Sequence, residues 1–223
     1  MARWVLSLKI YKSKILPASL LLILVPGILF RLLYLGSLVL YWDEPLHSIR
    51  IDALSFYDVV IYNNASALFA LLVHFLLPLA KIEIMARLPS MLAGILSIWV
   101  VYHLGRRLFS ERTGLWAAAF TAFSPYLIRY SQYARAYSVF LLFCLAAALY
   151  FFLALEKGRE KHWMFFALFL ILAVYTHLSG LLLVSAWALF ILASFFMYEG
   201  LRWDMGVGIF RSNNTCCILR PST

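Results

Sequence analysis

Long runs of apolar residues, separated by short polar and basic segments, set the pattern of this chain. Six of these runs are long enough to cross about 30 Å of hydrocarbon as helices. They cover residues 16–38, 86–104, 114–130, 137–155, 163–179 and 181–198. A seventh run, residues 65–80, is shorter and contains Pro78. The pattern predicts an all-α membrane protein, a polytopic helical bundle of about six transmembrane helices.

The placement of Lys and Arg predicts which side of the membrane each loop faces, because short loops rich in these residues stay in the cytoplasm. With six spans, most of the 19 Lys and Arg residues lie on the side of the basic N-terminal tail, residues 1–14. Asp43 and Glu44 then lie on the opposite side. We therefore expect a multi-pass protein of the cell (plasma) membrane, with both termini inside and the active face outward.

The predicted outer loop, residues 41–84, is long enough to hold structure of its own. Apolar residues in its first half recur at the spacing of one helix face, which predicts a surface helix over residues 45–62. Residues 65–80 are expected to form a second, amphipathic or re-entrant helix on the outer leaflet. The transmembrane module is then residues 15–198. The cytoplasmic tail, 199–223, ends in a polar stretch without periodicity, residues 210–223, and is expected to be the aberrant end of a truncated or frame-shifted chain.

Composition supports the membrane class and excludes several others. The chain is 65% hydrophobic and only 13% charged, and its mean hydropathy is +0.89, well above a soluble domain. The net charge of +9 does not indicate nucleic acid, because the basic residues are spread over short loops rather than gathered on one face. The three cysteines suggest no disulfide framework.

Two adjacent acids, Asp43 and Glu44, follow the first apolar run at the expected membrane edge. Neighbouring carboxylates repel each other and resist desolvation, so they add little to the stability of a purely structural protein. An enzyme with a membrane-bound substrate could use them as a general base or as metal ligands. The alternative is a hydrated loop at the interface that happens to begin with acids.

Several short motifs follow one another in an order that is more specific than any one of them. They are Trp42-Asp43-Glu44, Arg87-Leu88-Pro89-Ser90, Leu104-Gly105-Arg106-Arg107-Leu108-Phe109, Ser124-Pro125-Tyr126, Tyr130-Ser131-Gln132-Tyr133-Ala134-Arg135-Ala136-Tyr137 and Tyr175-Thr176-His177. With this order and spacing the chain resembles the GT-C glycosyltransferases, particularly the dolichyl-phosphate-mannose protein mannosyltransferase and aminoarabinose transferase group (glycosyltransferase family 39-like). The resemblance covers residues 15–198 and corresponds to the N-terminal part of such a protein.

The resemblance implies a partial GT-C fold and an inverting hexosyltransferase. The donor would be a polyprenyl-phosphate-linked sugar, and the acceptor a hydroxyl of a protein, lipid or glycan on the outer face. By the same resemblance, Asp43 is the catalytic base and Glu44 its neighbour, which orients it or holds an ion. Family members often carry an acid where this chain has Tyr133.

The leaving phosphate of such a donor needs cationic side chains at headgroup depth. Arg135 is the favoured candidate because it lies within the best-matching motif. Arg87 is a second candidate, with snorkelling to the interface as its alternative role, and Arg129 is expected to be a membrane anchor. Arg31 lies within the first apolar run, where a charge faces a cavity or a partner rather than lipid, and it is a further candidate for binding the substrate.

The remaining candidate site residues are polar or aromatic. Tyr130, Gln132 and Tyr137 could hydrogen-bond sugar or phosphate, although interfacial aromatic residues would explain the tyrosines as well. His177, at the outer end of the fifth span, could meet the headgroup or an ion. His47 follows Glu44 by three residues, the spacing of one helix face, so it could orient the base or be a ligand for a divalent metal ion. The alternative is a polar loop histidine without a role.

Two further functions remain open at the level of sequence. A non-catalytic membrane transporter or assembly subunit would share the hydropathy pattern, although no internal repeat of the transporter kind is seen in the sequence. An inactive fragment would also insert into the membrane. A catalytic requirement for Asp43 separates the enzyme from both.

Overall fold

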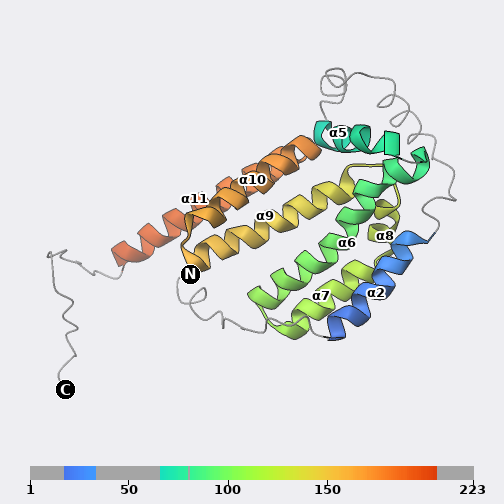
Figure 1. Ribbon diagram of the computed structural model, residues 1–223. Helices are drawn as coiled ribbons and strands as arrows, with labels where there is room; N and C mark the ends of the chain where they lie inside the picture. Colours follow the sequence, from blue (N-terminus) through green and yellow to red (C-terminus); the bar gives the residue numbers. More distant parts are fainter. Residues whose placement is uncertain (1–17, 34–65, 80, 205–223) are drawn as a thin grey trace. The chain divides into compact units, whose positions relative to one another are not determined.

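The computed structural model describes residues 18–33, 66–79 and 81–204. Within these ranges every regular element is a helix (Figure 1), so the all-α prediction is confirmed there. The helices are α2 (Ala18–Leu32), α5 (Ala67–Leu76), the 3₁₀ turn η1 (Leu77–Leu79), α6 (Ile82–Leu108), α7 (Glu111–Phe123), α8 (Pro125–Ser131), α9 (Tyr137–Lys157), α10 (Glu160–Thr176) and α11 (Gly180–Asp204). The chain divides into two compact units, and the boundary between them falls after Ser185, within α11.

Two of these helices, α6 with 27 residues and α9 with 21, are long and apolar enough to cross a membrane. At about 1.5 Å per residue they reach roughly 40 Å and 30 Å. Three shorter apolar helices accompany them, Ala18–Leu32, Ala67–Leu79 and Gly180–Ser194. The six-span arrangement remains a prediction. The predicted outer helix 65–80 corresponds to α5 and η1, whereas the predicted helix 45–62 lies outside the described residues.

The expectation of one continuous helix over residues 114–130 is wrong. The helix α7 ends at Phe123, Ser124 is extended with φ −63° and ψ 119°, and Pro125 opens α8. A proline disfavours the helical conformation of the preceding residue and has no N–H for the helix ladder. The 13 residues of α7 therefore reach only about 20 Å. The structure has two short helices where the hydropathy pattern alone suggested one span.

The long helix α6 is the centre of the bundle. It packs against α7 and α9 along much of its length and also contacts α2, α5 and α8 (Figure 1). Small residues allow the approach of α7: a Cβ at Gly114 would lie 2.6 Å from the Tyr102 carbonyl oxygen. At the same end, Arg107 of α6 forms an ion pair with Glu156 of α9. These contacts hold α6, α7 and α9 together at the end of the bundle opposite the α8–α9 junction.

Candidate functional site

The segment between α8 and α9, residues 132–136, is held by neighbours on several sides, and we call it the α8–α9 turn. The Gln132 side-chain nitrogen Nε2 donates to the carbonyl oxygens of Phe30 at 2.9 Å and Leu33 at 2.8 Å, at the end of α2. From α6, the Ser90 hydroxyl donates to the Arg135 carbonyl at 2.7 Å. The turn thereby connects α2, α6, α8 and α9.

The turn is also anchored by apolar contacts. Ala134 and Ala136 are buried, and they belong to a cluster that includes Phe69 and Val73 of α5 and Ala93 of α6. Small side chains let the backbone of the turn lie close to both helices. A backbone held by hydrogen bonds and by packing at once is expected to keep its conformation when a ligand arrives.

Arg31 lies at the base of this junction and is completely buried. Its Nε donates to Ser131 Oγ at 3.2 Å, and its Nη1 donates to the carbonyl oxygens of Gly27 at 2.9 Å and Ala122 at 3.0 Å. Its Nη2 donates to the Thr121 carbonyl at 2.9 Å. Four bonds occupy most of the five N–H donors of a guanidinium. Arg31 therefore binds the bundle itself, joining α2 to the ends of α7 and α8.

The break at Pro125 explains why Arg31 is needed there. In a continuous helix the Thr121 carbonyl would accept from the N–H of residue 125, but proline has none. The Nη2 group of Arg31 supplies the missing donor. The guanidinium thus satisfies a helix end that the sequence itself leaves incomplete.

Gly94 of α6 provides the space for this arrangement. A Cβ at this position would lie 2.0 Å from Ser131 Oγ and 3.2 Å from Arg31 Nε. Ser131 is itself fixed, because its hydroxyl donates to the Leu127 carbonyl at 2.6 Å. We call Arg31, Gly94, Thr121 and Ser131 the Arg31 node.

Three of the predicted site residues come together beside the turn. The ring of Tyr130, at the end of α8, lies 5.2 Å from that of Tyr137, at the start of α9. Tyr137 in turn lies 5.6 Å from His177, the residue that ends α10. Tyr130 is 37% exposed and Tyr137 is 43% exposed. We call Tyr130, Tyr137 and His177 the aromatic strip.

His177 is held in place by local geometry. The residue is extended, with φ −155° and ψ 135°, and its N–H caps the Ala173 carbonyl at 3.0 Å. Its Nδ1 accepts from the Ser179 N–H at 3.2 Å, so the neutral ring carries its proton on Nε2. The strip therefore offers one imidazole donor and two phenol hydroxyls.

The predicted cationic residues differ in their surroundings. Arg87 is fully buried in α6, so the alternative that it snorkels with an exposed head group is wrong. Arg135 is half-buried in the α8–α9 turn. The Nε of Arg129 donates to the Tyr133 hydroxyl at 2.7 Å, and its guanidinium lies 5.4 Å from the centre of that ring. Arg129 is thus bound to the residue that stands where the resembling family often has an acid.

The predicted catalytic acids and metal ligands lie in a different part of the chain. Asp43, Glu44 and His47 lie outside the described residues. Across the part of the chain that the structure describes, no three His, Cys, Asp or Glu side chains gather closely enough to hold a metal ion. The divalent ion considered from the sequence remains a prediction that rests on Glu44 and His47.

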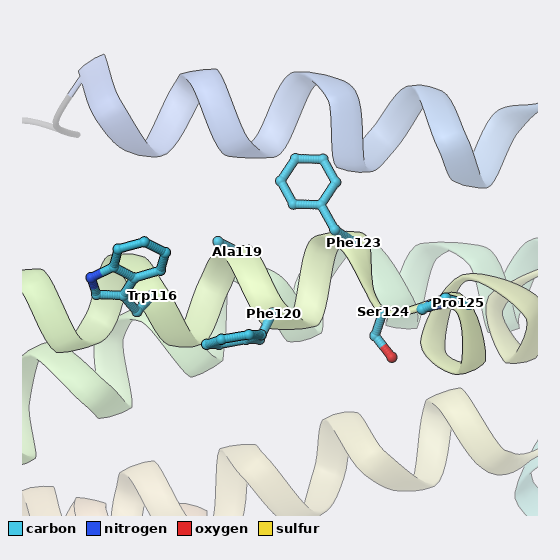
Figure 2. A pocket seen from close by; sticks show the side chains of 6 residues that line it. All are labelled: Trp116, Ala119, Phe120, Phe123, Ser124 and Pro125. Atoms are coloured by element: carbon cyan, nitrogen blue, oxygen red, sulfur yellow. The ribbon is translucent and has the colours of Figure 1, made fainter.

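An open apolar groove of about 560 Å³ runs along α7 to the helix break. Figure 2 shows its lining side chains, Trp116, Ala119, Phe120, Phe123, Ser124 and Pro125. The ring of Phe123 also packs edge-on against Phe30 of α2, with 6.1 Å between centroids. No charged side chain lines this groove among the described residues, so its surface suits hydrocarbon rather than a headgroup.

A buried histidine lies in the first turn of α10. His162 is 8% exposed, and neither of its ring nitrogens has a hydrogen-bond partner among the described residues. Desolvation lowers the pKa of His162 below its ordinary value, and nearby positive charges lower it further. These charges belong to Lys157, Lys161, Arg159 and Arg107.

Sequence reasoning missed Ser90, Thr121 and Ser131 as parts of the site. Their contacts are to backbone atoms and to a guanidinium, and hydroxyl residues in apolar helices are common enough to carry no signal alone. One signal was present: Ser124-Pro125 breaks the helix and leaves a carbonyl without its donor. A buried cation elsewhere in the chain is the natural partner for such a carbonyl.

The described residues form a helical bundle. Two of its helices are long and apolar enough to cross a membrane, and a buried arginine and a partly exposed cluster of polar aromatic rings lie at one helix junction. The chain belongs to the dolichyl-phosphate-mannose-protein mannosyltransferase family, whose profile matches residues 60–201, more than half of its 223 residues. This confirms the resemblance drawn from the motifs and places the chain among membrane glycosyltransferases of the mannosyltransferase type. No curated protein and no solved structure matches it.

The family match has a definite relation to the candidate site. It includes Arg87, the α8–α9 turn and all three residues of the aromatic strip. Asp43 and Glu44 precede it. The family assignment and the described geometry therefore concern the same part of the chain.

Proposed function

We propose that this protein transfers a hexose or related sugar from a polyprenyl-phosphate donor to an acceptor hydroxyl. The acceptor belongs to a protein, a lipid or a glycan, and transfer takes place on the outer face of the cell membrane with inversion at the sugar carbon. Family membership supports the transferase class. The observation that carries the proposal furthest is the anchored α8–α9 turn, which holds Arg135 between two helices and beside Tyr137.

The donor phosphate is the group that the turn would bind. A phosphate leaving from a sugar gains charge, and arginine compensates that charge with paired, directional N–H donors. Ser90 fixes the backbone of Arg135, and Arg87 precedes Ser90 by three residues on the same side of α6. The hydrogen bond from Ser90 therefore joins the helix that carries Arg87 to the turn that carries Arg135. Arg135 is proposed as the phosphate ligand and Arg87 as its buried support.

The acceptor hydroxyl requires a base, because its own pKa is far above neutral. In the proposed reaction the hydroxyl oxygen forms a bond to the sugar carbon as the bond from that carbon to the phosphate oxygen breaks. The proton passes to Asp43, and the polyprenyl phosphate leaves with the bonding electrons. Glu44 orients Asp43, or with His47 holds a divalent ion that would polarise the phosphate.

Arg31 and Gln132 take positioning roles in this scheme rather than contacts with substrate. Most donors of the Arg31 guanidinium and the amide nitrogen of Gln132 are already bound to the bundle. Both side chains connect the end of α2 to the junction that carries Arg135. Arg31 and Gln132 are therefore proposed to position the junction that carries Arg135.

The membrane arrangement that fits this scheme has six spans within residues 15–198, with both termini in the cytoplasm. In that arrangement the α8–α9 turn and His177 share the outer side with Asp43. Residues 67–79 lie at the outer leaflet and cover the junction. The hydropathy of α6 and α9 supports spanning by these two helices.

Substitution of the proposed base tests the function. Asp43→Asn keeps the shape of the side chain and removes its basicity, so sugar transfer from polyprenyl-phosphate hexose should fall about 10²–10⁴-fold. Asp52→Asn, an acid of the same outer loop, is the control and should keep turnover near the wild-type value. Transfer is measured in membranes with matched protein levels. Equal turnover by Asp43→Asn and wild type would remove the base from the scheme and favour a transporter or assembly subunit.

A further inference from the structure

The aromatic strip has features that neither packing nor membrane anchoring requires. Its rings come from three separate elements, α8, α9 and the end of α10, yet successive centroids lie 5.2 Å and 5.6 Å apart. Phe140 of α9 also packs against His177, with 5.5 Å between ring centroids. Anchoring at a membrane interface needs each tyrosine ring at the headgroup level, and it does not require the rings to contact one another. The rings are tilted to one another, by 61° between Tyr130 and Tyr137 and by 42° between Tyr137 and His177, so this partly exposed cluster offers both ring faces and ring edges to a ligand.

The functional groups of the aromatic strip indicate which class of ligand it can bind. Its rings offer flat apolar faces, and its two hydroxyls and the Nε2–H of His177 offer hydrogen bonds at their edges. A prenyl chain cannot form hydrogen bonds with the polar groups, and a phosphate alone makes little favourable contact with the apolar ring faces. A pyranose has an apolar face of C–H groups and a rim of hydroxyls, so it can use both.

We propose that the aromatic strip binds the sugar ring of the lipid-linked donor. This inference rests on the proposed function and specifies which surface recognises the sugar. Tyr137 follows Arg135 by two residues, and Tyr130 lies on the other side of the same turn. The sugar of such a donor is bonded directly to its phosphate, so a phosphate at Arg135 places the sugar beside Tyr137. An acceptor sugar has no such link to the turn.

Equilibrium binding separates the sugar from the rest of the donor. The full chain, purified in detergent, is titrated with a short-chain polyprenyl phosphate and with the same lipid carrying a hexose. Wild type should bind the hexose-bearing lipid more tightly. Tyr137→Leu removes the central ring and should weaken that binding about five- to tenfold, the size of one aromatic contact, while leaving the sugarless lipid unchanged. Tyr137→Phe keeps the ring and should lose less.

Two further variants make the result specific. Tyr126→Leu removes a tyrosine of α8 that is 74% exposed and not part of the strip, and it should bind both lipids as wild type does. Arg135→Ala should weaken the binding of both lipids by a similar factor, because both carry the phosphate that Arg135 is proposed to bind. Thermal unfolding of each variant checks that the fold is kept, and a variant that unfolds early is replaced by His177→Leu at the other end of the strip.

Each outcome decides the proposal. A loss of hexose preference in Tyr137→Leu, with Tyr126→Leu unaffected, supports it. Equal weakening of both lipids by Tyr137→Leu assigns the ring to the membrane interface and overturns it. If wild type binds both lipids with equal affinity, the strip does not recognise the sugar and the proposal is wrong, whereas the proposed phosphate site is still supported. If wild type binds neither lipid, the proposed function fails, and the sugar site fails with it.

Discussion

Replacing Arg31 by methionine tests how the bundle is held together at its polar junction. Methionine is close in length and apolar, so Arg31→Met keeps most of the packing and removes four hydrogen bonds. The Thr121 carbonyl then has no donor, because Pro125 supplies none. A buried polar group left without its partner costs about 1–3 kcal/mol, and bonds from a charged donor are worth more than neutral ones.

The loss of a buried charge offsets part of this cost, since the guanidinium no longer has to be desolvated. We expect the net free energy of unfolding to fall by about 2–4 kcal/mol. The assay is unfolding in mixed micelles with increasing denaturing detergent, followed by circular dichroism. Arg112→Met, an exposed arginine in the first turn of α7, is the control and should change the free energy of unfolding by less than about 0.5 kcal/mol.

A second substitution isolates the bond that the helix break makes necessary. Pro125→Ala restores an N–H that can reach the Thr121 carbonyl. In that background Arg31→Met should cost about 1 kcal/mol less than in wild type, a coupling that a double-mutant cycle measures directly. A cost for Arg31→Met that is the same with and without proline would refute the assignment of Nη2 as the missing donor. A cost below about 0.5 kcal/mol would refute the node altogether.

Two further predictions concern the same bundle. Gly94→Ala places a methyl group 2.0 Å from Ser131 Oγ, so it should lower the free energy of unfolding by about 2 kcal/mol. Gly158→Ala, at the left-handed end of α9 with φ 60°, should lower it by only about 1 kcal/mol. A larger loss for Gly158→Ala than for Gly94→Ala would contradict the close contact at Gly94. The pKa of His162 is lower in the folded than in the unfolded chain. The part of the free energy of unfolding that depends on neutral His162 should therefore be fully present above about pH 6.5 and be lost as the pH falls below that value toward the folded pKa. His162→Leu should flatten this dependence between about pH 5 and 7 in thermal unfolding, and an unchanged slope would assign it to other groups.

The hydropathy pattern was sufficient for the helices but not for their ends. The runs near 86–104 and 137–155 correspond to α6 and α9, because long apolar segments with few charges have few alternatives to helix. The run 114–130 failed as one helix, since hydropathy does not register that Pro125 lacks an N–H. Local backbone chemistry decided that boundary.

The candidate site was predictable residue by residue but not as an arrangement. Tyr130, Tyr137 and His177 could be named singly from the motifs, but their proximity depends on how α8, α9 and α10 pack. Arg31 was expected to face a cavity or a partner. Its partners are mostly backbone carbonyls, which have no signature in sequence, so only the structure shows that its donors are taken.

The most direct test of the account is the donor KM of Arg135→Ala, measured against that of Arg112→Ala in sugar transfer from polyprenyl-phosphate hexose. If Arg135 binds the donor phosphate, its loss removes a charge-assisted contact of about 1.5–3 kcal/mol, which corresponds to a rise in donor KM of roughly 10- to 100-fold. Arg112→Ala should leave the KM unchanged. A donor KM of Arg135→Ala equal to that of wild type, with the fold intact, would contradict a phosphate site at the α8–α9 turn.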